Sequence, residues 1–380
     1  MPELARHVDA VPPSGIRRVY ELAVQLPDVL MLAIGEPDVE PAEHIARAAQ
    51  RAWDEGATDY TPNGGIPAFR QAVVDKLARD NGLRVDVEQV WSTVGATQAL
   101  FQALGLVLDA GDEVLIPDPG YTTFPMGARM LHAEPVRYAL RPEHGFLPDV
   151  AELETLVTER TRALIVNTPS NPLGVVFPEA TVRELLAFAR RHDLWVISDE
   201  VYERFAHTRA HVSPAALDED DRVLSVFSLS KTYAMTGIRA GWLVTPPGLT
   251  EVMRRVQEAQ ISCINTPAQY AAVAALTGPQ DAVGVAAAHY RENIRLATQL
   301  LRQRGIRHHE PEGAFYLWID VSHVSGGDVA AWAERFVLEQ RVAVAPGSAF
   351  GRTGEGWIRV CAASPTETLL EGLRRLPSPV

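Results

Sequence analysis

Short apolar runs alternate with helical patterns through most of the chain. The apolar runs with the length of buried strands are 89–94, 112–117, 161–167, 194–200, 222–230 and 238–245. Between two of them, in the segment 179–193, apolar residues recur every three to four positions, which is typical of a helix with one buried face. This alternation predicts an α/β fold in which a mostly parallel central sheet is flanked by helices.

The two ends of the chain have different patterns. The segments 41–56 and 66–82 have the apolar spacing of amphipathic helices, whereas residues 1–40 are punctuated by proline and are expected to be mostly irregular. From about residue 280 one long helical stretch is followed by short segments that predict a smaller α+β domain: strands at 315–321, 341–346 and 357–362, and a helix at 327–340. We therefore expect a large domain at 41–278 and a small domain at 279–380, with the segment 1–40 packed against the small domain.

The composition of the chain argues against several classes of binding partner. Lys and Arg total 35 against 48 Asp and Glu, a net charge of −13, which argues against nucleic acid or an anionic membrane as the main partner. The two cysteines, Cys263 and Cys361, belong to no CxxC or Cys/His cluster, so we expect neither a metal site nor a disulfide framework. The first thirty residues carry several charges and no apolar signal core. We expect a cytoplasmic protein.

Lysine is scarce, which makes each lysine a candidate for amine chemistry. The two lysines are Lys76 and Lys231. Lys76 lies on the polar face of the predicted helix 66–82, and we expect it to remain solvated. Lys231 follows an apolar strand; a solvated loop lysine is the common case, but a partly desolvated amine has a lowered pKa and becomes a nucleophile for Schiff-base chemistry. Ser228 and Lys231 also form an SxxK pair, but the SDN and KTG elements of penicillin-interacting enzymes are absent.

Polar residues gather where several predicted strands end, and ligands bind at this edge of open parallel sheets. The surrounding sequence then matches a family pattern in ordered blocks: IGEPD (34–38), YTPNGGIPAFR (60–70), GATQAL (95–100), PDPGY (117–121), NTPSNPLG (167–174), SDEVY (198–202), SLSKTYAMTGIRAG (228–241), EGAFY (312–316), and PGSAF with IRVCAAS (346–364). The chain resembles the class I/II aminotransferases, which are pyridoxal-phosphate (PLP) enzymes of fold type I. The resemblance implies that residues 41–278 form the PLP-binding domain.

The resemblance implies roles for the residues at the centre of the site. Lys231 forms the internal aldimine with PLP and later moves the proton between the substrate Cα and C4′. Asp199 faces the pyridine nitrogen and keeps it protonated, although an Asp after a strand also serves as a helix N-cap. Tyr202 and Asn171 hydrogen-bond the phenolic oxygen. Tyr121 stacks on the ring, although a Tyr in a PGY turn is otherwise a turn residue half packed on the core.

The resemblance also implies a phosphate site and a shared assembly. The expected phosphate ligands are the backbone N–H groups of Gly95, Ala96 and Thr97 at a helix start, with Ser228 and Arg239. An ordinary surface position is the alternative for Arg239, one of 33 arginines. Tyr60 matches the residue that reaches the phosphate of the neighbouring subunit, which implies a homodimer with shared active sites.

Substrate contacts are implied for three residues. Arg359 matches the arginine that binds the α-carboxylate bidentately, Gly35 lets the backbone approach the substrate closely, and Asn171 is also implied to contact the substrate. Thr97 stands where some dicarboxylate-specific relatives carry lysine, and no Lys or Arg lies between Arg255 and Arg291, where another subgroup supplies an arginine. These departures favour a neutral side chain, aliphatic or aromatic. Glutamate can still act as the second substrate through a moving or N-terminal residue.

The implied activity is a ping-pong transfer of an amino group between an L-amino acid and a 2-oxo acid through the Lys231 aldimine. A PLP-dependent lyase, decarboxylase or oxidase on the same scaffold is the alternative, because one intermediate can lead to several products. The effector-sensing half of a transcription regulator is a third hypothesis. The net charge of −13 and the lack of an extra basic domain argue against it.

Overall fold

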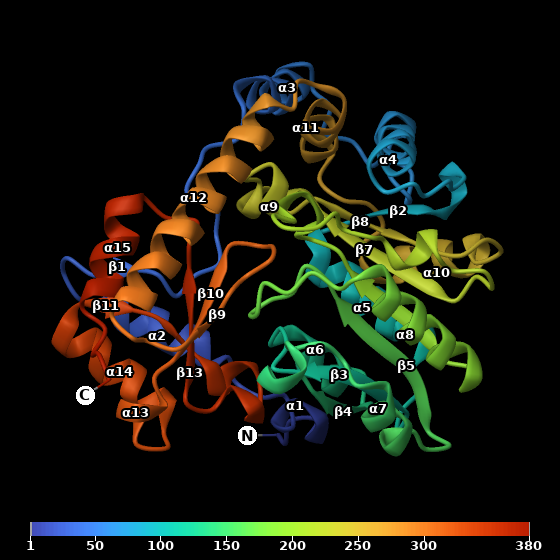
Figure 1. Cartoon of the computed structure of the whole chain (residues 1–380). Helices are drawn as coiled ribbons and strands as arrows, with labels where there is room; N and C mark the ends of the chain where they lie inside the picture. The colour runs from blue at the N-terminus through green and yellow to red at the C-terminus, as the bar shows by residue number, and fades with distance from the viewer. Residues whose placement is uncertain (1, 380) are drawn as a thin grey trace.

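The computed structural model describes residues 2–379. In this part of the chain, a seven-stranded sheet has the order β2-β8-β7-β6-β5-β3-β4 and forms the centre of the molecule (Figure 1). The strands are β2 (Val90–Thr93), β3 (Glu113–Asp118), β4 (Glu134–Ala139), β5 (Thr161–Asn167), β6 (Trp195–Asp199), β7 (Val223–Ser228) and β8 (Gly241–Val244). Strand β8 runs antiparallel to both of its neighbours, and the other pairs are parallel. The predicted mostly parallel sheet is confirmed.

Helices cover both faces of this sheet. Helix α5 (Gly95–Val107) packs on the face that carries Ile165, and α8 (Glu179–Arg191) packs on the opposite face with Leu164. Neighbouring residues of a strand point to opposite faces, so a strand covered on both sides must be apolar throughout. This explains why the central strands appear in the sequence as continuous apolar runs.

A group of helices caps one end of the large sheet. Helix α3 (Glu43–Asp54) packs against α11 (Thr266–Thr277), and α11 also contacts α4 (Pro67–Asp80), as seen at the top of Figure 1. The helices predicted at 41–56 and 66–82 are confirmed. The remaining helices around the large sheet are α6 (Thr123–Met130), α7 (Val150–Leu156), α9 (Leu229–Thr232) and α10 (Thr250–Gln260).

The C-terminal part of the chain builds a second, antiparallel sheet beside the first (Figure 1). Its order is β12-β13-β10-β9, and the strands are β9 (His308–His309), β10 (Tyr316–Asp320), β12 (Ala345–Pro346) and β13 (Trp357–Cys361). Its helices are α12 (Asp281–Gln303), α13 (Ser322–Ser325), α14 (Val329–Gln340) and α15 (Thr366–Arg374). The smaller α+β unit expected from the sequence is therefore present.

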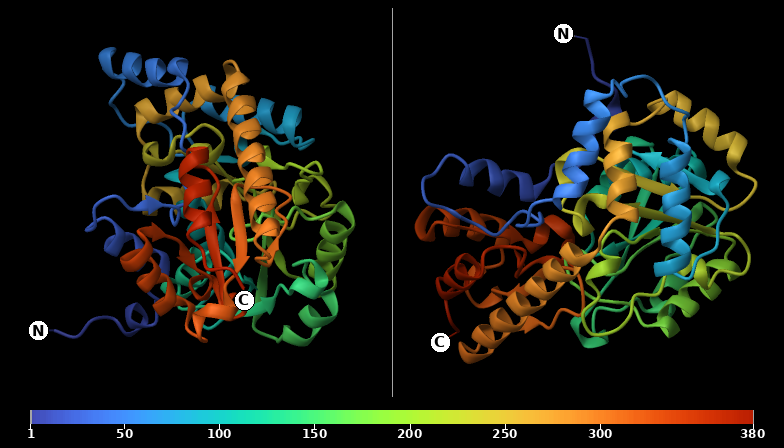
Figure 2. Two further views of the ribbon diagram at one scale, coloured as in Figure 1. Left: turned by 60° about the vertical axis from the view of Figure 1, so that its left-hand side comes forward. Right: turned by 90° about the horizontal axis from the view of Figure 1, so that it is seen from above.

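The N-terminal segment has more regular structure than its prolines indicated. It contains α1 (Arg6–Asp9), α2 (Gly15–Ala23) and β1 (Leu30–Met31). Strand β1 pairs in parallel with β11 (Val342–Ala343), and α2 packs against α14, so this segment lies beside C-terminal elements (Figure 2). Most of the segment is irregular, as expected, but α2 is a regular helix, because Val19 and Ala23 form a buried stripe and Ser14 caps the helix start.

Strand β4 was not predicted from the sequence, because its residues do not form an apolar run. It forms the edge of the large sheet and pairs only with β3 within the described residues. Pro135 and Arg137 lie in it and are half-buried, as an edge strand allows. Tertiary position, and not composition, makes this segment a strand.

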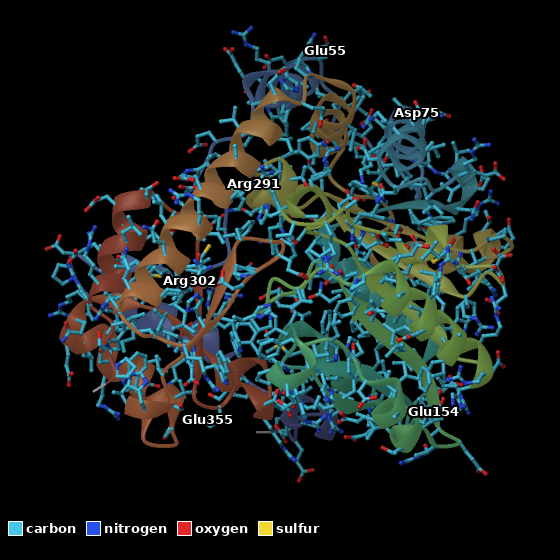
Figure 3. The ribbon with its side chains drawn as sticks, in the orientation of Figure 1. Glu55, Asp75, Glu154, Arg291, Arg302 and Glu355 are labelled. Carbon is cyan, nitrogen blue, oxygen red and sulfur yellow. The ribbon has the colours of Figure 1, made fainter. Side chains whose placement is uncertain are left out.

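Charged residues occupy the outer surface, as Glu55, Asp75 and Glu154 show at the periphery in Figure 3. Across residues 2–379, none of the helices combines the length and the apolar character that a bilayer crossing requires. The same residues contain no group of three or more His, Cys, Asp or Glu side chains placed to hold a metal ion.

Candidate active site

A cavity of about 320 Å³ lies at the carboxyl ends of the central parallel strands. Asn171 follows β5, Asp199 ends β6 and Ser228 ends β7, and all three line the cavity. The small sheet contributes Tyr316 and Arg359 from β10 and β13. The cavity therefore lies between the two sheets, at the edge where ligands bind in open parallel sheets.

Lys231 enters this cavity from the one-turn helix α9, which follows β7 directly. The hydroxyl of Ser228 caps α9 by accepting a hydrogen bond from the backbone N–H of Ser230 at 3.1 Å. The Lys231 ammonium donates to the carbonyl oxygen of Gly35 at 2.6 Å. The sequence SLSK thus turns the chain sharply at the end of a buried strand and aims the amine at the cavity.

The surroundings of Lys231 favour its neutral form. Burial lowers the pKa of Lys231 from 10.5 to about 8, the thiol of Cys361 opposes this change, and the positive charge of Arg359 adds to it. An amine with such a pKa is a nucleophile and a proton acceptor near neutral pH.

Asp199 forms no ion pair in the described part of the chain, although the charge of Lys231 acts on it and lowers its pKa. Its side chain is buried, and one oxygen accepts a long hydrogen bond of 3.4 Å from the Val201 N–H. Burial raises the pKa of Asp199 to about 7, against the lowering effect of that hydrogen bond. A buried carboxylate that forms no ion pair is costly to the stability of the fold, so this group is suited to a positively charged ligand atom in the cavity.

Two buried phenols meet beside Asp199. The hydroxyl oxygens of Tyr202 and Tyr316 lie 2.7 Å apart and share a hydrogen bond. Burial raises the pKa of Tyr202 well above its ordinary value and raises that of Tyr316 as well. Both phenols therefore stay protonated. One hydroxyl hydrogen is used in the bond that they share, and the other remains available to a ligand oxygen.

A cluster of donors forms the opposite wall. Helix α5 begins at Gly95, with φ of 73° and no side-chain cap on its first N–H groups. Arg239 lies against this turn, where a Cβ on residue 95 would be 2.7 Å from its Nη2. The Arg239 Nη1 donates to the Thr236 carbonyl at 2.8 Å. Free N–H groups at a helix start, together with a guanidinium, are suited to a phosphate.

Arg359 is buried between the two sheets without a carboxylate partner among the described residues. Its Nη1 donates to the Asn171 Oδ1 at 2.8 Å and its Nη2 to the Ala33 carbonyl at 2.6 Å, while Nε is buried with no partner. The guanidinium carbon lies 4.4 Å from the ring centroid of Tyr316. A buried guanidinium of this kind is suited to the carboxylate of a ligand.

The structure brings most of the residues predicted from the sequence into one place. The cavity is lined by Gly35, Ala96, Thr97, Tyr121, Asn171, Asp199, Tyr202, Ser228, Lys231, Arg239 and Arg359. Gly95 adjoins it beneath Arg239. Tyr60 lies elsewhere: its side chain is 91% exposed, beside Trp53 and the segment 263–267.

The cavity also contains residues to which the sequence analysis gave no role. Tyr316 lies in the EGAFY block, so the block itself was the available signal. Ser14 and Arg17 come from the start of α2, in a segment expected to be irregular. No sequence pattern placed that segment over the cavity.

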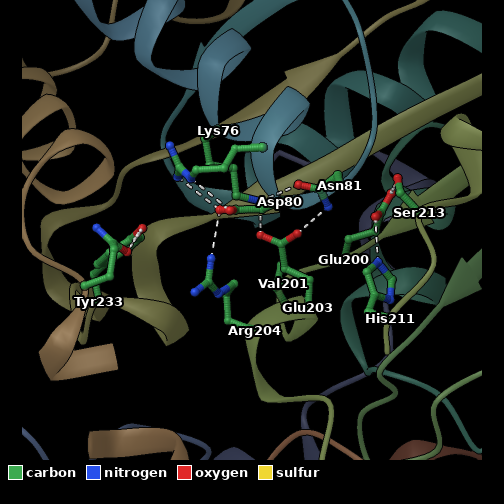
Figure 4. A network of polar contacts seen from close by, with 12 residues as sticks. Lys76, Asp80, Asn81, Glu200, Val201, Glu203, Arg204, His211, Ser213 and Tyr233 are labelled. Carbon is green, nitrogen blue, oxygen red and sulfur yellow. Dashed lines mark hydrogen bonds and ion pairs between the residues drawn. The ribbon is translucent and has the colours of Figure 1, made fainter. Parts of the chain in front are cut away.

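Lys76 departs from the sequence expectation, because it is buried and not solvated (Figure 4). It forms an ion pair with Glu203 and donates to the Asn81 Oδ1 at 2.7 Å. Its ammonium lies 5.0 Å from the ring centroid of Phe227. The helix face that carries Lys76 packs on the sheet, so the residue connects α4 to the turn after Tyr202.

A second buried acid lies behind Asp199. Glu200 is fully buried, with its carboxylate 2.8 Å from the His211 Nε2 and accepting from the Ser213 hydroxyl at 3.1 Å (Figure 4). These contacts fix the residue that follows Asp199. The turn that carries Asp199 and Tyr202 is thus held on both sides by buried polar contacts.

These features fit PLP. The unpaired carboxylate of Asp199 matches the pyridine nitrogen, the Lys231 amine matches the aldehyde, and the cluster around Gly95 and Arg239 matches the phosphate. A Cβ at residue 95 would fill the space that Arg239 occupies, so the glycine is needed for this phosphate cluster.

Comparison with known proteins gives the same result over nearly the whole chain. Residues 27–376 match the family model of aminotransferase class I and II. The chain is 36% identical over 376 residues to the aspartate aminotransferase of Pyrococcus horikoshii, covering 98% of this chain and 96% of that protein. It is 37% identical to the aromatic-amino-acid aminotransferase 2 of Thermococcus litoralis, covering 98% and 97% of the two chains.

Solved structures share the fold as well. The aspartate aminotransferase of Thermus thermophilus with maleate superposes with a TM-score of 0.94 at 36% identity, covering 99% of both chains. An alanine aminotransferase from Pyrococcus furiosus gives a TM-score of 0.92 at 31% identity, covering 98% of both chains. The predicted fold type I architecture is confirmed, and this chain belongs to the class I and II aminotransferases, enzymes that depend on PLP.

Proposed function

We propose that this aminotransferase moves amino groups between an L-amino acid with a neutral side chain and a 2-oxo acid, with Lys231 as the reacting amine. The observation that carries the proposal is the meeting of two groups in one cavity. Lys231 has a pKa lowered to about 8, and Asp199 is a buried carboxylate that forms no ion pair among the described residues. PLP, when bound, supplies an electron sink that stabilises negative charge at the substrate Cα.

Lys231 and Asp199 have separate tasks in this proposal. When PLP is bound, the neutral Lys231 amine would hold the cofactor aldehyde and, once released by the substrate amine, would carry a proton between the substrate Cα and the cofactor. Asp199 would accept a hydrogen bond from the pyridine nitrogen and keep that nitrogen protonated. Tyr202 and Asn171 would donate hydrogen bonds to the phenolic oxygen, and Tyr121 would pack on the ring.

The remaining residues position the two ends of the ligands. Arg359 holds the substrate α-carboxylate with its planar fork, and the Gly95 turn, Ser228 and Arg239 hold the phosphate. Gly35 lies so close to the Tyr316 hydroxyl that a Cβ would overlap it. Only glycine therefore lets the backbone of residue 35 lie this close to Tyr316.

The lining of the cavity supports a neutral substrate side chain. Thr97 is uncharged, and Ile16, Ile34 and Leu100 add apolar surface. Relatives of this chain are named for aspartate, aspartate/prephenate and aromatic amino acids, so the fold accommodates several side-chain classes. We assign the amino donor to the neutral class on the basis of this lining.

We also propose a cytoplasmic homodimer in which Tyr60 completes the partner's phosphate site. The exposed rings of Tyr60 and Trp53 support this assembly, because exposed aromatic clusters mark interfaces. Mixing Lys231→Ala with Tyr60→Ala subunits tests it. Each variant should be impaired alone, and hybrids should regain activity at the one site that keeps both residues. Hybrids without activity, or a monomer by light scattering, would contradict the assembly.

The division of the chain at 40/41 and 278/279 is likewise a proposal. It is supported by the pairing of β1 with β11 and by the packing of α2 on α14. Limited proteolysis of the enzyme should cut first near these boundaries.

Borohydride reduction and peptide mapping test the central assignment. Because the chain contains two lysines, Lys76 is an internal control, buried against Glu203. The label is expected on Lys231. A panel of amino acids, read by cofactor absorbance in single turnovers, should then give one 2-oxo acid per cofactor with no free ammonia. A label only on Lys76 or the N-terminus would overturn the role of Lys231, and ammonia release without an acceptor would indicate a lyase or oxidase.

A further inference from the structure

Tyr316 lines the cavity but has no role in the proposed function. Its buried side chain comes from β10 of the small sheet. Its ring lies against Arg359, with the guanidinium carbon 4.4 Å from the ring centroid, and its hydroxyl oxygen is 2.7 Å from that of Tyr202. Tyr316 therefore contacts two residues that are proposed to hold different ligands, because Arg359 is assigned to the substrate and Tyr202 to the cofactor.

The hydrogen bond between the two phenols has a preferred direction. One hydroxyl hydrogen lies between the two oxygens, and the more acidic phenol is the better donor. Burial raises the pKa of Tyr316, but the positive charge of Arg359 is the largest influence against this increase. Burial also raises the pKa of Tyr202, and the contact with Tyr316 raises it further. Tyr316 is thus the better donor of the two, which leaves the hydrogen of Tyr202 for a ligand oxygen.

The packing around Tyr316 holds its hydroxyl beside Tyr202. Gly35 lies so close that a Cβ on residue 35 would be 2.1 Å from the Tyr316 hydroxyl oxygen. The two phenol rings form a T-shaped contact, with centroids 5.6 Å apart and an interplanar angle of 77°. Because Tyr202 belongs to the turn after β6 of the large sheet, the hydrogen bond connects the two sheets across the cavity.

We propose that Tyr316 is a positioning residue that donates its hydrogen to the Tyr202 oxygen and so directs the Tyr202 hydroxyl to the phenolic oxygen of PLP. The inference rests on the proposed contact between Tyr202 and the cofactor, and adds a residue of the small sheet that acts through it. In a chain of hydrogen bonds each bond polarises the next, so Tyr202 becomes a stronger donor. A stronger donor stabilises negative charge on the phenolic oxygen and lowers the pKa of the proton that bound PLP holds beside that oxygen.

Absorbance titration of the enzyme with bound PLP tests this inference, because the absorbance changes when this proton is lost. Tyr316→Phe removes the donor and keeps the ring against Arg359. Its midpoint should rise by about 0.2–0.5 pH unit, since cooperative strengthening is a fraction of one hydrogen bond. Tyr202→Phe removes the direct contact and should raise the midpoint by about one to two pH units. Adding Tyr316→Phe to Tyr202→Phe should cause no further change, because Tyr316 acts through Tyr202.

Tyr290→Phe is the matched control. Tyr290 belongs to the same buried aromatic cluster as Tyr202 and Tyr316 but lies outside the group of residues that line the cavity. Loss of its hydroxyl should leave the midpoint unchanged. An equal rise in Tyr290→Phe and Tyr316→Phe would show that repacking of the cluster moves the midpoint, and would overturn the inference.

The remaining outcomes separate this inference from the proposed function. An unchanged midpoint in Tyr316→Phe, with a raised midpoint in Tyr202→Phe, overturns the inference alone. The same rise from Tyr316→Phe with and without the Tyr202 hydroxyl also overturns it, because Tyr316 would then act directly on the cofactor or through Gly35. An unchanged midpoint in Tyr202→Phe refutes the proposed contact of Tyr202 with PLP and the inference with it. A wild-type enzyme that never attaches PLP to Lys231 refutes the proposed function itself.

Discussion

The guanidinium of Arg359 donates to the Asn171 Oδ1 at 2.8 Å, so a strand of the small sheet is hydrogen-bonded to the loop that follows β5 of the large sheet. Arg359 is proposed to hold the substrate and Asn171 to touch the cofactor. The contact therefore sets the distance between the two ligands. Such positioning raises the reaction rate more than affinity alone does, because a small displacement of the reacting groups lowers the rate.

This relationship predicts the effect of Arg359→Lys. Lysine keeps the charge but cannot contact Asn171, the Ala33 carbonyl and a carboxylate together. We expect kcat/KM to fall roughly tenfold to a hundredfold for every amino acid, whatever its side chain. Cofactor attachment to Lys231 should be unaffected.

Stopped-flow half-reactions with several amino donors measure this effect, and Arg352→Lys, an exposed change in the same part of the chain, is the control. A loss confined to one class of side chain would show that Arg359 recognises something other than the α-carboxylate.

Asp199→Asn should lower the activity of the enzyme with bound cofactor and raise the stability of the cofactor-free protein. The enzyme with bound cofactor should lose on the order of a hundredfold in turnover, because the amide cannot hold a proton on the pyridine nitrogen. The cofactor-free variant should be more stable than the wild type at pH 8, because the wild type must then bury an ionised carboxylate.

The sign of the pH effect follows from the pKa of Asp199, which burial raises from 3.8 to about 7. The folded protein binds this proton more tightly than the unfolded chain does, so the contribution of Asp199 to stability falls as pH rises from about 4 to 7 and is constant above. The loss is at most about 4 kcal/mol, at about 1.4 kcal/mol per pH unit. Urea unfolding of both cofactor-free proteins should show a gap that is small at pH 4 and large at pH 8. A gap independent of pH would contradict the role of the buried charge.

The lowered pKa of Lys231 predicts how cofactor attachment depends on pH. Its pKa is lowered to about 8, first by burial, so about one amine in ten is neutral at pH 7, against roughly one in three thousand at an ordinary pKa. The attachment rate should rise with pH and level off above about 8, because the neutral amine is the nucleophile. Rapid mixing of PLP with cofactor-free enzyme measures the rate, and a midpoint near 10 would show that Lys231 is solvated.

The part of the candidate site that follows buried strands was predictable from the sequence pattern, whereas residues such as Arg239 and Arg359 were implied by the family resemblance. Asp199 and Ser228 end apolar runs, and the topology of a parallel sheet brings such ends to one edge. The edge strand β4 and the helix α2 were not predictable in this way, because tertiary neighbours determine them. Arg17 was missed for the same reason, since its place over the cavity depends on the packing of α2 against the small sheet.

The burial of Lys76 could not be predicted from the pattern of the sequence. A lysine on an amphipathic helix is normally solvated, and nothing near it in the sequence indicates Glu203, which is 127 residues away. The two side chains are only 2% and 9% exposed. The ion pair becomes visible only when α4 packs on the sheet.

Lys76→Met should therefore destabilise the enzyme strongly, because it leaves the buried Glu203 carboxylate without its cation. We expect the free energy of unfolding to fall by about 3–5 kcal/mol, and the double variant Lys76→Met with Glu203→Leu to recover most of it, since two apolar groups replace two buried charges. Urea unfolding of the cofactor-free proteins measures both changes. Arg79→Met, which breaks the more exposed pair with Asp80 on the same helix, is the control and should cost less than about 1 kcal/mol. Equal losses for Lys76→Met and Arg79→Met would show that helix packing, and not the buried charge on Glu203, explains the effect.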